Sequence, residues 1–405
     1  MIDRRSRPAG IALLALVLVA GCSTAQPTPS AGVPMPSAVA AQTPSPSSPA
    51  SPASSAAPSA APSASASAGV SCTVTSPSAS FSPHPIGPDD PNAALLSGIE
   101  SQVQSIRGIT ATTQVPRYTL DQTGLCAYLR QTMAEKMPPE QLAATERLYK
   151  QLDMMPANQS LEDIVLNLTS SQVVGFYDEN RKTMNVIDRP GLVGPAEQLI
   201  YAHEYDHALQ DQAYGLKGVL DAAPDQSDRG FARLSLVEGD ATLLMSLWAQ
   251  RNLTSAQLMQ VVNAADPASQ AALDAAPPIL RETLLWPYTQ GLSLVLGAYQ
   301  TSASFGGVER LWNNPPDTTE QLIHPDKLAS REPAVPVAFP PDVAKRLGSG
   351  WKMAMEDTLG ELQLNILMRT GNAAAGTDPA AGWGGDRVAL LEGPNGGRAA
   401  VVDTA

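Results

Sequence analysis

Two histidines four residues apart, His203 and His207, set the strongest limit on how this chain folds. On an α-helix, such residues are rotated by only about 40° and lie one above the other on a single face. Two imidazoles in this arrangement can bind one metal ion, and neutral imidazole suits zinc. Glu204 follows the first histidine, so its carboxylate can reach a water at the metal and act as a general base. The pattern therefore predicts a helix that carries a catalytic Zn²⁺ site.

The pattern alone leaves a second interpretation open, in which the histidines form a surface pair on an amphipathic helix and Glu204 is solvated. The chain has 4 histidines, and half of them stand in this spacing, which makes chance a poor explanation. A third ligand would decide between the two interpretations. The metzincin form of the motif needs a glycine and a histidine where this chain has Gln210 and Ala213, so that form is excluded.

Glu238 is the candidate third ligand. It lies 31 residues after His207 (238 − 207), inside the largely apolar run Leu236–Ala241. An unpaired carboxylate is costly to bury in such surroundings, and a metal ion would offset that cost. We expect Glu238 to be the ligand, with Asp240 or Asp211 as alternatives. A position for Glu238 on the exposed face of an amphipathic helix also remains open.

With Glu238 as a ligand, the chain resembles the gluzincin zinc metallopeptidases, which carry His-Glu-x-x-His on one helix and a glutamate ligand on the next. The segments His203–Gln212 and Val237–Ala241 are also similar to a group of bacterial exported zincin-like proteins. This similarity extends from Gly175–Asp178 to Gly382–Arg387, which is most of the expected folded part. The resemblance implies a zinc peptidase that lays a peptide or protein substrate along the strand at Gly175–Asp178.

One departure from the gluzincin pattern concerns the groups that orient the ligands. Several gluzincins have an aspartate four residues after the glutamate ligand, where this chain has Thr242. Asp240 and Asp211 are then the candidates for orienting a histidine, although Asp211 could equally be an exposed helix charge. Zinc peptidases also need a donor for the oxyanion of the reaction, and His324 and Tyr288 are the candidates for that catalytic role. A histidine or tyrosine beside proline is more often structural.

Hydrophobic periodicity predicts an α+β fold that is mostly helical and zincin-like, with a small sheet before the motif helix and a helical C-terminal lobe. The expected helices span residues 93–106, 124–133, 139–152, 160–168, 196–214, 231–251, 255–262, 279–285, 290–301 and 355–370. The expected strands span 172–177 and 182–187, and a C-terminal hairpin pairs 387–391 with 398–402.

The N-terminal region is expected to export and anchor the protein. Residues 1–21 have a basic start, a short apolar run and a small-residue cleavage site, as in a signal peptide. Cys22 follows Val-Ala-Gly, which resembles a lipobox and implies a lipidated membrane anchor; an ordinary secretory signal is the alternative. Residues 22–88, rich in Ser, Ala and Pro, predict a disordered tether, and residues 89–405 the folded domain.

Charge and cysteine content limit the partners and the compartment. A net charge of −13 argues against nucleic acid as a partner. Cys72 and Cys126 could pair in an oxidising, exported setting, although Cys72 lies in the tether.

We therefore expect a membrane-anchored, extracytoplasmic zinc metallopeptidase in which Glu204 is the general base. One alternative is an exported zincin-fold binding protein that lacks activity. The other is a metal-free envelope lipoprotein whose N-terminal helices bind a partner.

Overall fold

The computed structural model describes Cys72 and residues 81–187, 193–223, 225–264, 267–370 and 378–405. This part is α+β and mostly helical, with a small sheet before the motif helix, as predicted. The expected signal segment 1–21, the lipidation site Cys22 and most of the tether 22–88 lie outside the described residues.

The helices of the N-terminal half confirm the predicted order. They are α2 (Ala93–Arg107), α3 (Gln122–Lys136), α4 (Pro139–Gln151) and α5 (Leu161–Gln172). Helix α5 begins where the sequence signals a cap, because the Ser160 side chain accepts a hydrogen bond from the Asp163 amide at 3.2 Å. Helix α4 begins with Pro139, whose missing N–H has no partner to lose in a first turn.

A four-stranded sheet accompanies these helices. It contains β1 (His84–Pro85), β2 (Arg117–Leu120), β3 (Gly175–Asp178) and β4 (Thr183–Ile187), in the order β1-β2-β4-β3. Strands β3 and β4 form the predicted hairpin, whereas β1 and β2 were not expected. Strand β2 pairs with β4 in parallel, which places β3 at one edge of the sheet.

Residues from the expected tether also contact the fold. A disulfide joins Cys72 to Cys126 on α3, which confirms that pairing. Strand β1 pairs with β2, and the Phe81 ring packs on Tyr128 with ring centroids 5.3 Å apart. The folded part therefore includes residues before position 89.

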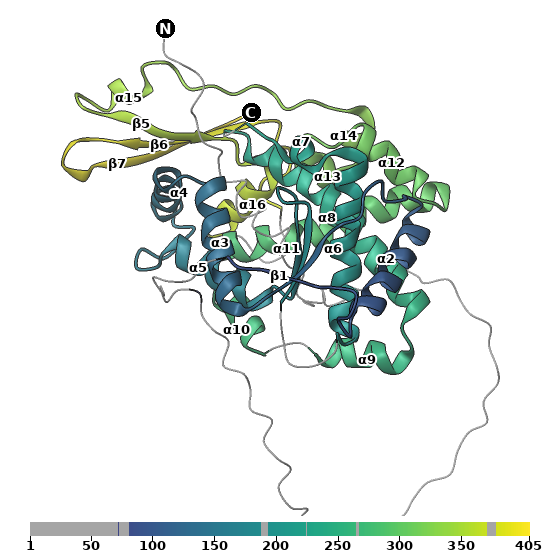
Figure 1. Cartoon of the computed structure of the whole chain (residues 1–405). Coiled ribbons are helices and arrows are strands. Elements are labelled where there is room, and N and C mark those ends of the chain that lie inside the picture. Colours follow the sequence, from purple (N-terminus) through teal and green to yellow (C-terminus); the bar gives the residue numbers. More distant parts are fainter. Residues whose placement is uncertain (1–71, 73–80, 188–192, 224, 265–266, 371–377) are drawn as a thin grey trace, which may run out of the picture. The chain divides into compact units, whose positions relative to one another are not determined.

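Three long helices form the centre of the fold. They are α6 (Pro195–Tyr214), α8 (Ser227–Asn252) and α11 (Pro278–Ser302), with the short α7 (Leu216–Leu220) between the first two. Figure 1 shows α6 and α8 side by side. The sequence predicted two helices, 279–285 and 290–301, where the structure has the single helix α11. Pro287 lies between the two predicted helices, and proline lacks the N–H that a helix interior needs. Helix α11 continues through Pro287 while packing against α8.

The remaining helices are mostly short. They are α9 (Ser255–Asn263), α10 (Pro267–Ala275), α12 (Gly306–Asn313), α13 (Glu320–Ile323), α14 (Pro325–Ser330) and α15 (Val343–Arg346). Of these, only α9 was predicted.

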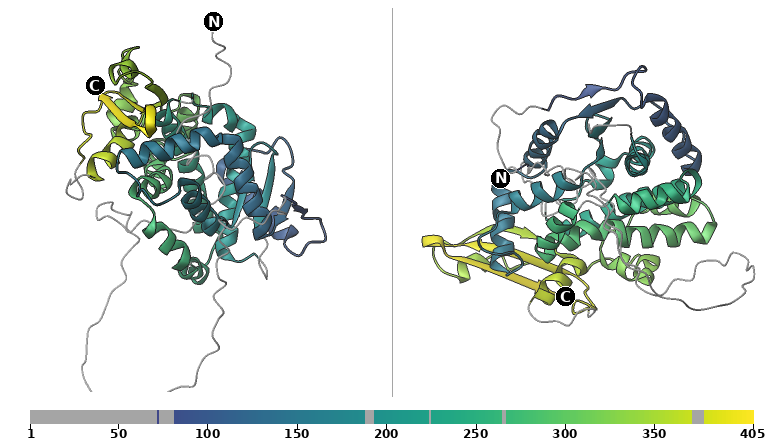
Figure 2. Two further views of the ribbon diagram at one scale, coloured as in Figure 1. Left: turned by 90° about the vertical axis from the view of Figure 1, so that its left-hand side faces the viewer. Right: turned by 90° about the horizontal axis from the view of Figure 1, so that it is seen from below.

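A second sheet lies in the C-terminal half, where only a hairpin was expected. The predicted helix 355–370 is wrong in its first part, because Met355 belongs to β5 (Lys352–Asp357) and α16 spans Gly360–Thr370. Strand β5 pairs with β6 (Asp386–Glu392), and β6 pairs with β7 (Arg398–Thr404) across the 3-10 turn Pro394–Gly396. Figure 2 shows this sheet on the side of the fold away from α2.

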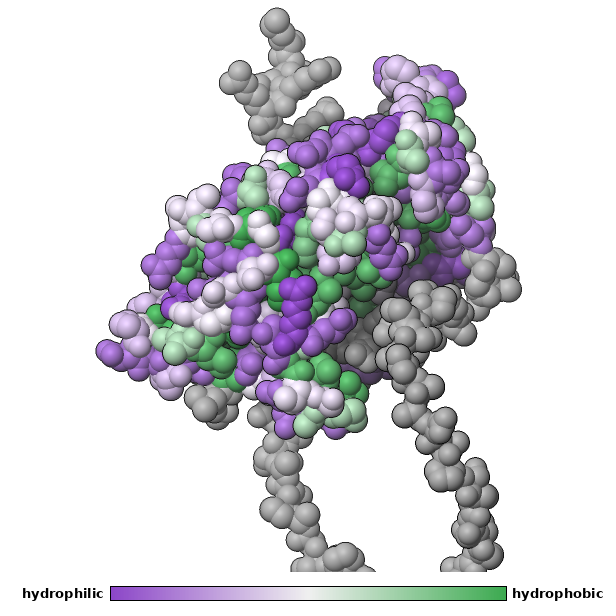
Figure 3. Space-filling model, turned by 90° about the vertical axis from the view of Figure 1, so that its right-hand side faces the viewer, coloured by the Kyte–Doolittle hydropathy of each residue, from purple (hydrophilic) through white to green (hydrophobic). Residues whose placement is uncertain are grey.

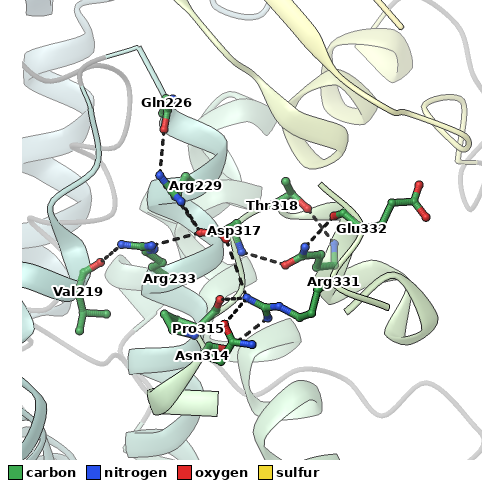
Figure 4. Close-up of polar contacts among 11 residues, drawn as sticks. Val219, Gln226, Arg229, Arg233, Asn314, Pro315, Asp317, Thr318, Arg331 and Glu332 are labelled. Carbon is green, nitrogen blue, oxygen red and sulfur yellow. Dashed lines mark hydrogen bonds and ion pairs between the residues drawn. The ribbon is translucent and has the colours of Figure 1, made fainter. Parts of the chain in front are cut away.

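An arginine cluster holds the chain between α12 and α14 against α8. Arg229 and Arg233 on α8 contact the Asp317 carboxylate at 2.8 and 3.2 Å, and Arg331 approaches it at 3.9 Å (Figure 4). Arg331 also donates to the carbonyl oxygens of Asn314 and Pro315. These contacts fix the segment that leads to His324.

The face that Figure 3 shows carries hydrophilic residues with hydrophobic ones between them. Among the described residues, no helix combines the length and the apolar character that crossing a membrane requires.

Candidate metal centre

Three side chains converge between α6 and α8. His203 and His207 come from α6 and Glu238 from α8, and all three are fully buried. The Nε2 atoms of the two histidines are 3.0 Å apart. Oε2 of Glu238 lies 3.2 Å from Nε2 of His203 and 3.5 Å from Nε2 of His207. The structure thus brings the predicted set together, and the interpretation of the histidines as a surface pair is wrong.

The spacing of these three atoms fits a tetrahedral metal ion. Donors held about 2 Å from a tetrahedral zinc ion are about 3.3 Å from one another. The separations of 3.0, 3.2 and 3.5 Å fall on both sides of that value. In addition, Oε1 of Glu238 is buried without a hydrogen-bond partner among the described residues. The three side chains could therefore hold one metal ion.

The charges around the site favour a cation. Burial alone would lower the pKa of His207, but the negative charge of Glu238 and a hydrogen bond to it outweigh burial and raise the pKa to about 10. Burial would raise the pKa of Glu238, but the charge of His207 and hydrogen bonds with both histidines outweigh burial and hold this pKa at about 2. Burial lowers the pKa of His203. A buried carboxylate that remains ionised beside two imidazoles creates a place for positive charge.

Gln210, one turn after His207 on α6, orients that histidine. Its Oε1 lies 2.9 Å from Nδ1 of His207, while its Nε2 donates to Asp206 at 3.0 Å and to the Val237 carbonyl at 3.1 Å. The two donated bonds fix which end of the amide faces the imidazole, so Nδ1 must carry the proton and donate it. Nε2 then faces His203 and Glu238, and with the raised pKa of this imidazole it carries a second proton that a bound metal would displace.

A buried ionic network lies beyond Gln210. Arg107, at the end of α2, donates to Asp240 at 2.9 Å and lies 3.9 Å from Asp206, and all three side chains are fully buried. Trp312 also donates to Asp240 at 2.7 Å. Burial, and then the charge of Asp240, raise the pKa of Asp206 to about 7. Asp240, expected as an alternative ligand or an orienting group, thus binds Arg107 and lies outside the three-ligand group.

Glu204 faces the edge strand of the first sheet. Its Oε2 accepts a hydrogen bond from the Tyr177 amide on β3 at 3.1 Å, and its Oε1 has no hydrogen-bond partner among the described residues. Burial raises the pKa of Glu204 to about 8, and the charge of Glu238 adds to the shift. A cavity of 10 Å³, about the room that one water needs, is lined by Glu204, Gly175 and Phe176. The oxygen without a partner suits a group that exchanges a proton with a neighbouring water.

Asp211 has a structural role on the same helix. It accepts a hydrogen bond from the Tyr177 hydroxyl at 2.7 Å and from the Leu216 amide at 3.1 Å, and it pairs with Lys182. It is therefore neither a ligand nor an exposed charge. Tyr177 contacts α6 twice, through its amide at Glu204 and through its hydroxyl at Asp211, and this holds β3 beside the helix.

The two candidate oxyanion donors lie in different places. The Tyr288 ring, on α11, has its centroid 6.2 Å from that of His203. His324 lies between α13 and α14, where its Nε2 is 2.9 Å from Oε1 of Glu361. His324 belongs to a second group, with Glu361 and Asp378. The catalytic role of each residue stays a prediction.

Close packing of α8 against α11 positions the segment that carries Glu238. A Cβ added at Gly239 would lie 2.2 Å from the C and O atoms of Gly291 on α11, so the two backbones are in direct contact there. The sequence shows both glycines but not that they meet.

Sequence reasoning missed Gln210, although its spacing of three residues from His207 places it on the same helix face. No family model matches this sequence, and comparisons with curated proteins and with solved structures give no significant match.

Proposed function

We propose that this protein is a zinc-dependent peptidase of gluzincin type, with His203, His207 and Glu238 as the metal ligands. The observation that carries the proposal is the convergence of their three donor atoms at separations of 3.0 to 3.5 Å in a buried site. Two imidazoles and one carboxylate, with a fourth position left for water, are typical of catalytic zinc sites. These donors are the reason for proposing zinc as the metal.

When bound, zinc would lower the pKa of a water toward about 7 and polarise a carbonyl group. Glu204 would accept a proton from the attacking water and pass it to the leaving amine. Its Oε1, which has no hydrogen-bond partner among the described residues, is available for this exchange. Gln210 keeps the His207 proton on Nδ1 throughout. Tyr288, whose ring centroid is 6.2 Å from that of His203, is a candidate for hydrogen bonding to the oxyanion.

The gluzincin resemblance is the basis for proposing a peptide substrate, and it assigns substrate binding to β3. This strand is at the edge of the first sheet and lies directly beside Glu204 through the Tyr177 amide. Edge strands bind extended peptides by backbone pairing. All four residues of β3 are buried, so the choice of a peptide bond as the bond that is cleaved rests on the gluzincin resemblance.

The place of action that we propose is the outer side of a membrane, with lipid on Cys22 as the anchor. The Cys72–Cys126 disulfide fits an oxidising compartment. Replacing Cys22 with alanine should release the protein from the membrane fraction. Continued membrane association of the Cys22→Ala variant would contradict this part of the proposal.

The test of activity is the digestion of a peptide library by the wild type and by Glu204→Gln. The variant should keep its zinc and lose turnover, because the amide cannot accept the proton. Glu162→Gln, which changes an exposed carboxylate on α5, serves as the matched control and should cleave as the wild type does. Unchanged cleavage by Glu204→Gln would contradict the mechanism. A wild type that binds zinc but cleaves nothing would instead point to a binding protein.

A further inference from the structure

A second convergence of metal-binding side chains shares no residue with the first. His324 stands between α13 and α14, Glu361 is in the first turn of α16, and Asp378 precedes β6. One donor atom from each lies within 4.8 Å of the other two. Three separate segments of the chain therefore meet at these side chains.

Glu361 distinguishes this group from ordinary surface charges. Its side chain is 0% exposed, and within the part of the chain that the structure describes, one of its oxygens has a partner, Nε2 of His324 at 2.9 Å. Its other oxygen, Oε2, is buried without a hydrogen-bond partner among the described residues. A buried carboxylate oxygen without a partner costs free energy, which a bound cation would offset.

The exposed ligand of the group is held in place by its neighbours. Asn365, one turn after Glu361 on α16, donates a hydrogen bond from Nδ2 to Asp378. Arg369 donates to Oδ1 of Asn365 at 2.6 Å, which directs the amide nitrogen of Asn365 toward Asp378. Arg369 in turn pairs with Glu282 on α11. This chain of contacts orients Asp378 in the way that outer groups orient metal ligands.

We propose that His324, Glu361 and Asp378 form a second metal site, which takes a divalent transition-metal ion such as Zn²⁺. Two carboxylates balance the charge of the ion, and the imidazole favours zinc and its neighbours over Mg²⁺ and Ca²⁺, which prefer oxygen ligands. Glu320 and Asp326 add negative charge around His324. Because Asp378 is exposed and the His324 side chain is 35% exposed, solvent completes the coordination and the ion exchanges more readily than at the first site.

The test is a calorimetric titration of metal-free full-length protein with Zn²⁺. The wild type should bind two equivalents, of which one is tight and one weaker. Asp378→Asn and Glu361→Gln should lose the weaker equivalent and keep the tight one. His203→Ala should do the reverse, so failure of one site can be told from failure of the other. Glu162→Gln, which changes an exposed carboxylate on α5 outside both groups, is the matched control and should bind as the wild type does.

Asn365→Ala adds a readout for the orienting contacts. It should weaken the second equivalent by about 10 to 100-fold without removing it, as is usual when an outer partner of a ligand is lost. Asp378 is exposed, so Asp378→Asn should fold normally, which circular dichroism checks. The proposal is overturned if Asp378→Asn and Glu361→Gln both bind Zn²⁺ as the wild type does. A wild type that binds only the equivalent removed by His203→Ala would leave His324 and Glu361 as a simple ion pair and would also overturn it.

Discussion

Gln210 holds His207 with its amide oxygen 2.9 Å from the Nδ1 atom of the imidazole. The amide cannot turn over without losing its bonds to Asp206 and to the Val237 carbonyl, so Nδ1 of His207 keeps its proton and Nε2 is the nitrogen left for a metal. A site prepared in this way binds its ion without rearranging the ligand.

Replacing Gln210 with leucine should weaken zinc binding by about 10 to 100-fold, because His207 loses the acceptor that fixes its tautomer. The dissociation constant can be measured by competition with a chelator. Gln212→Leu, two positions away on the same helix, is the control, since Gln212 bonds to Thr112 and Thr113 and does not contact the ligands. Equal zinc affinity in Gln210→Leu and the wild type would show that Gln210 has no orienting role.

Gly239→Ala should destabilise the protein by about 1–3 kcal/mol, because the new methyl group would overlap the backbone of Gly291 and push α8 from α11. The free energy of unfolding in urea measures the effect. The control is Gly297→Ala, on α11, where the added carbon meets nothing within 4 Å. This variant should be as stable as the wild type or slightly more stable. Equal stability of the two variants would contradict the close packing of α8 on α11.

Much of the fold follows from local sequence signals. The periodic helices α2, α4, α6 and α9 lie close to their predicted bounds, and Ser160 caps α5 as expected. Strands β5 and β2 were not predicted from the sequence. Each is short, and its pairing with β6 or β4 comes from a segment more than 25 residues away, which local periodicity does not reveal.

The site shows the same division between local and distant information. His203, His207 and Glu238 were found because two of them share one helix face and the third is a carboxylate in an apolar run. The role of Gln210 depends on where Asp206 and the Val237 carbonyl lie, and that of Asp211 depends on Tyr177 from β3. These partners are set by tertiary packing, so sequence spacing alone could not assign them.

Asp228 should make stability depend on pH. This buried carboxylate in the first turn of α8 accepts hydrogen bonds from Thr319, but burial outweighs them and raises its pKa from 3.8 to about 7. Between these two values the folded state binds more protons than the unfolded state, so the group's contribution to stability falls as pH rises through this window. Asp228→Asn cannot titrate and keeps the accepting oxygen.

The comparison needs urea unfolding of the wild type and Asp228→Asn at about pH 4 and about pH 8. The variant should gain stability relative to the wild type at the higher pH, by about 1.4 kcal/mol for each unit of pKa shift that is realised. A difference between the two proteins that is the same at both pH values would show that Asp228 does not titrate in this window.

Zinc content after gel filtration in metal-free buffer, measured by mass spectrometry for the wild type and for Glu238→Ala, tests the first site most directly. Gel filtration removes the more weakly held ion and leaves the tight one. The wild type should retain about one equivalent, and Glu238→Ala, which removes one of three ligands, should retain no zinc above the buffer blank. A wild type without zinc after exposure to the ion, or a Glu238→Ala variant that retains as much as the wild type, would contradict a metal centre at His203, His207 and Glu238.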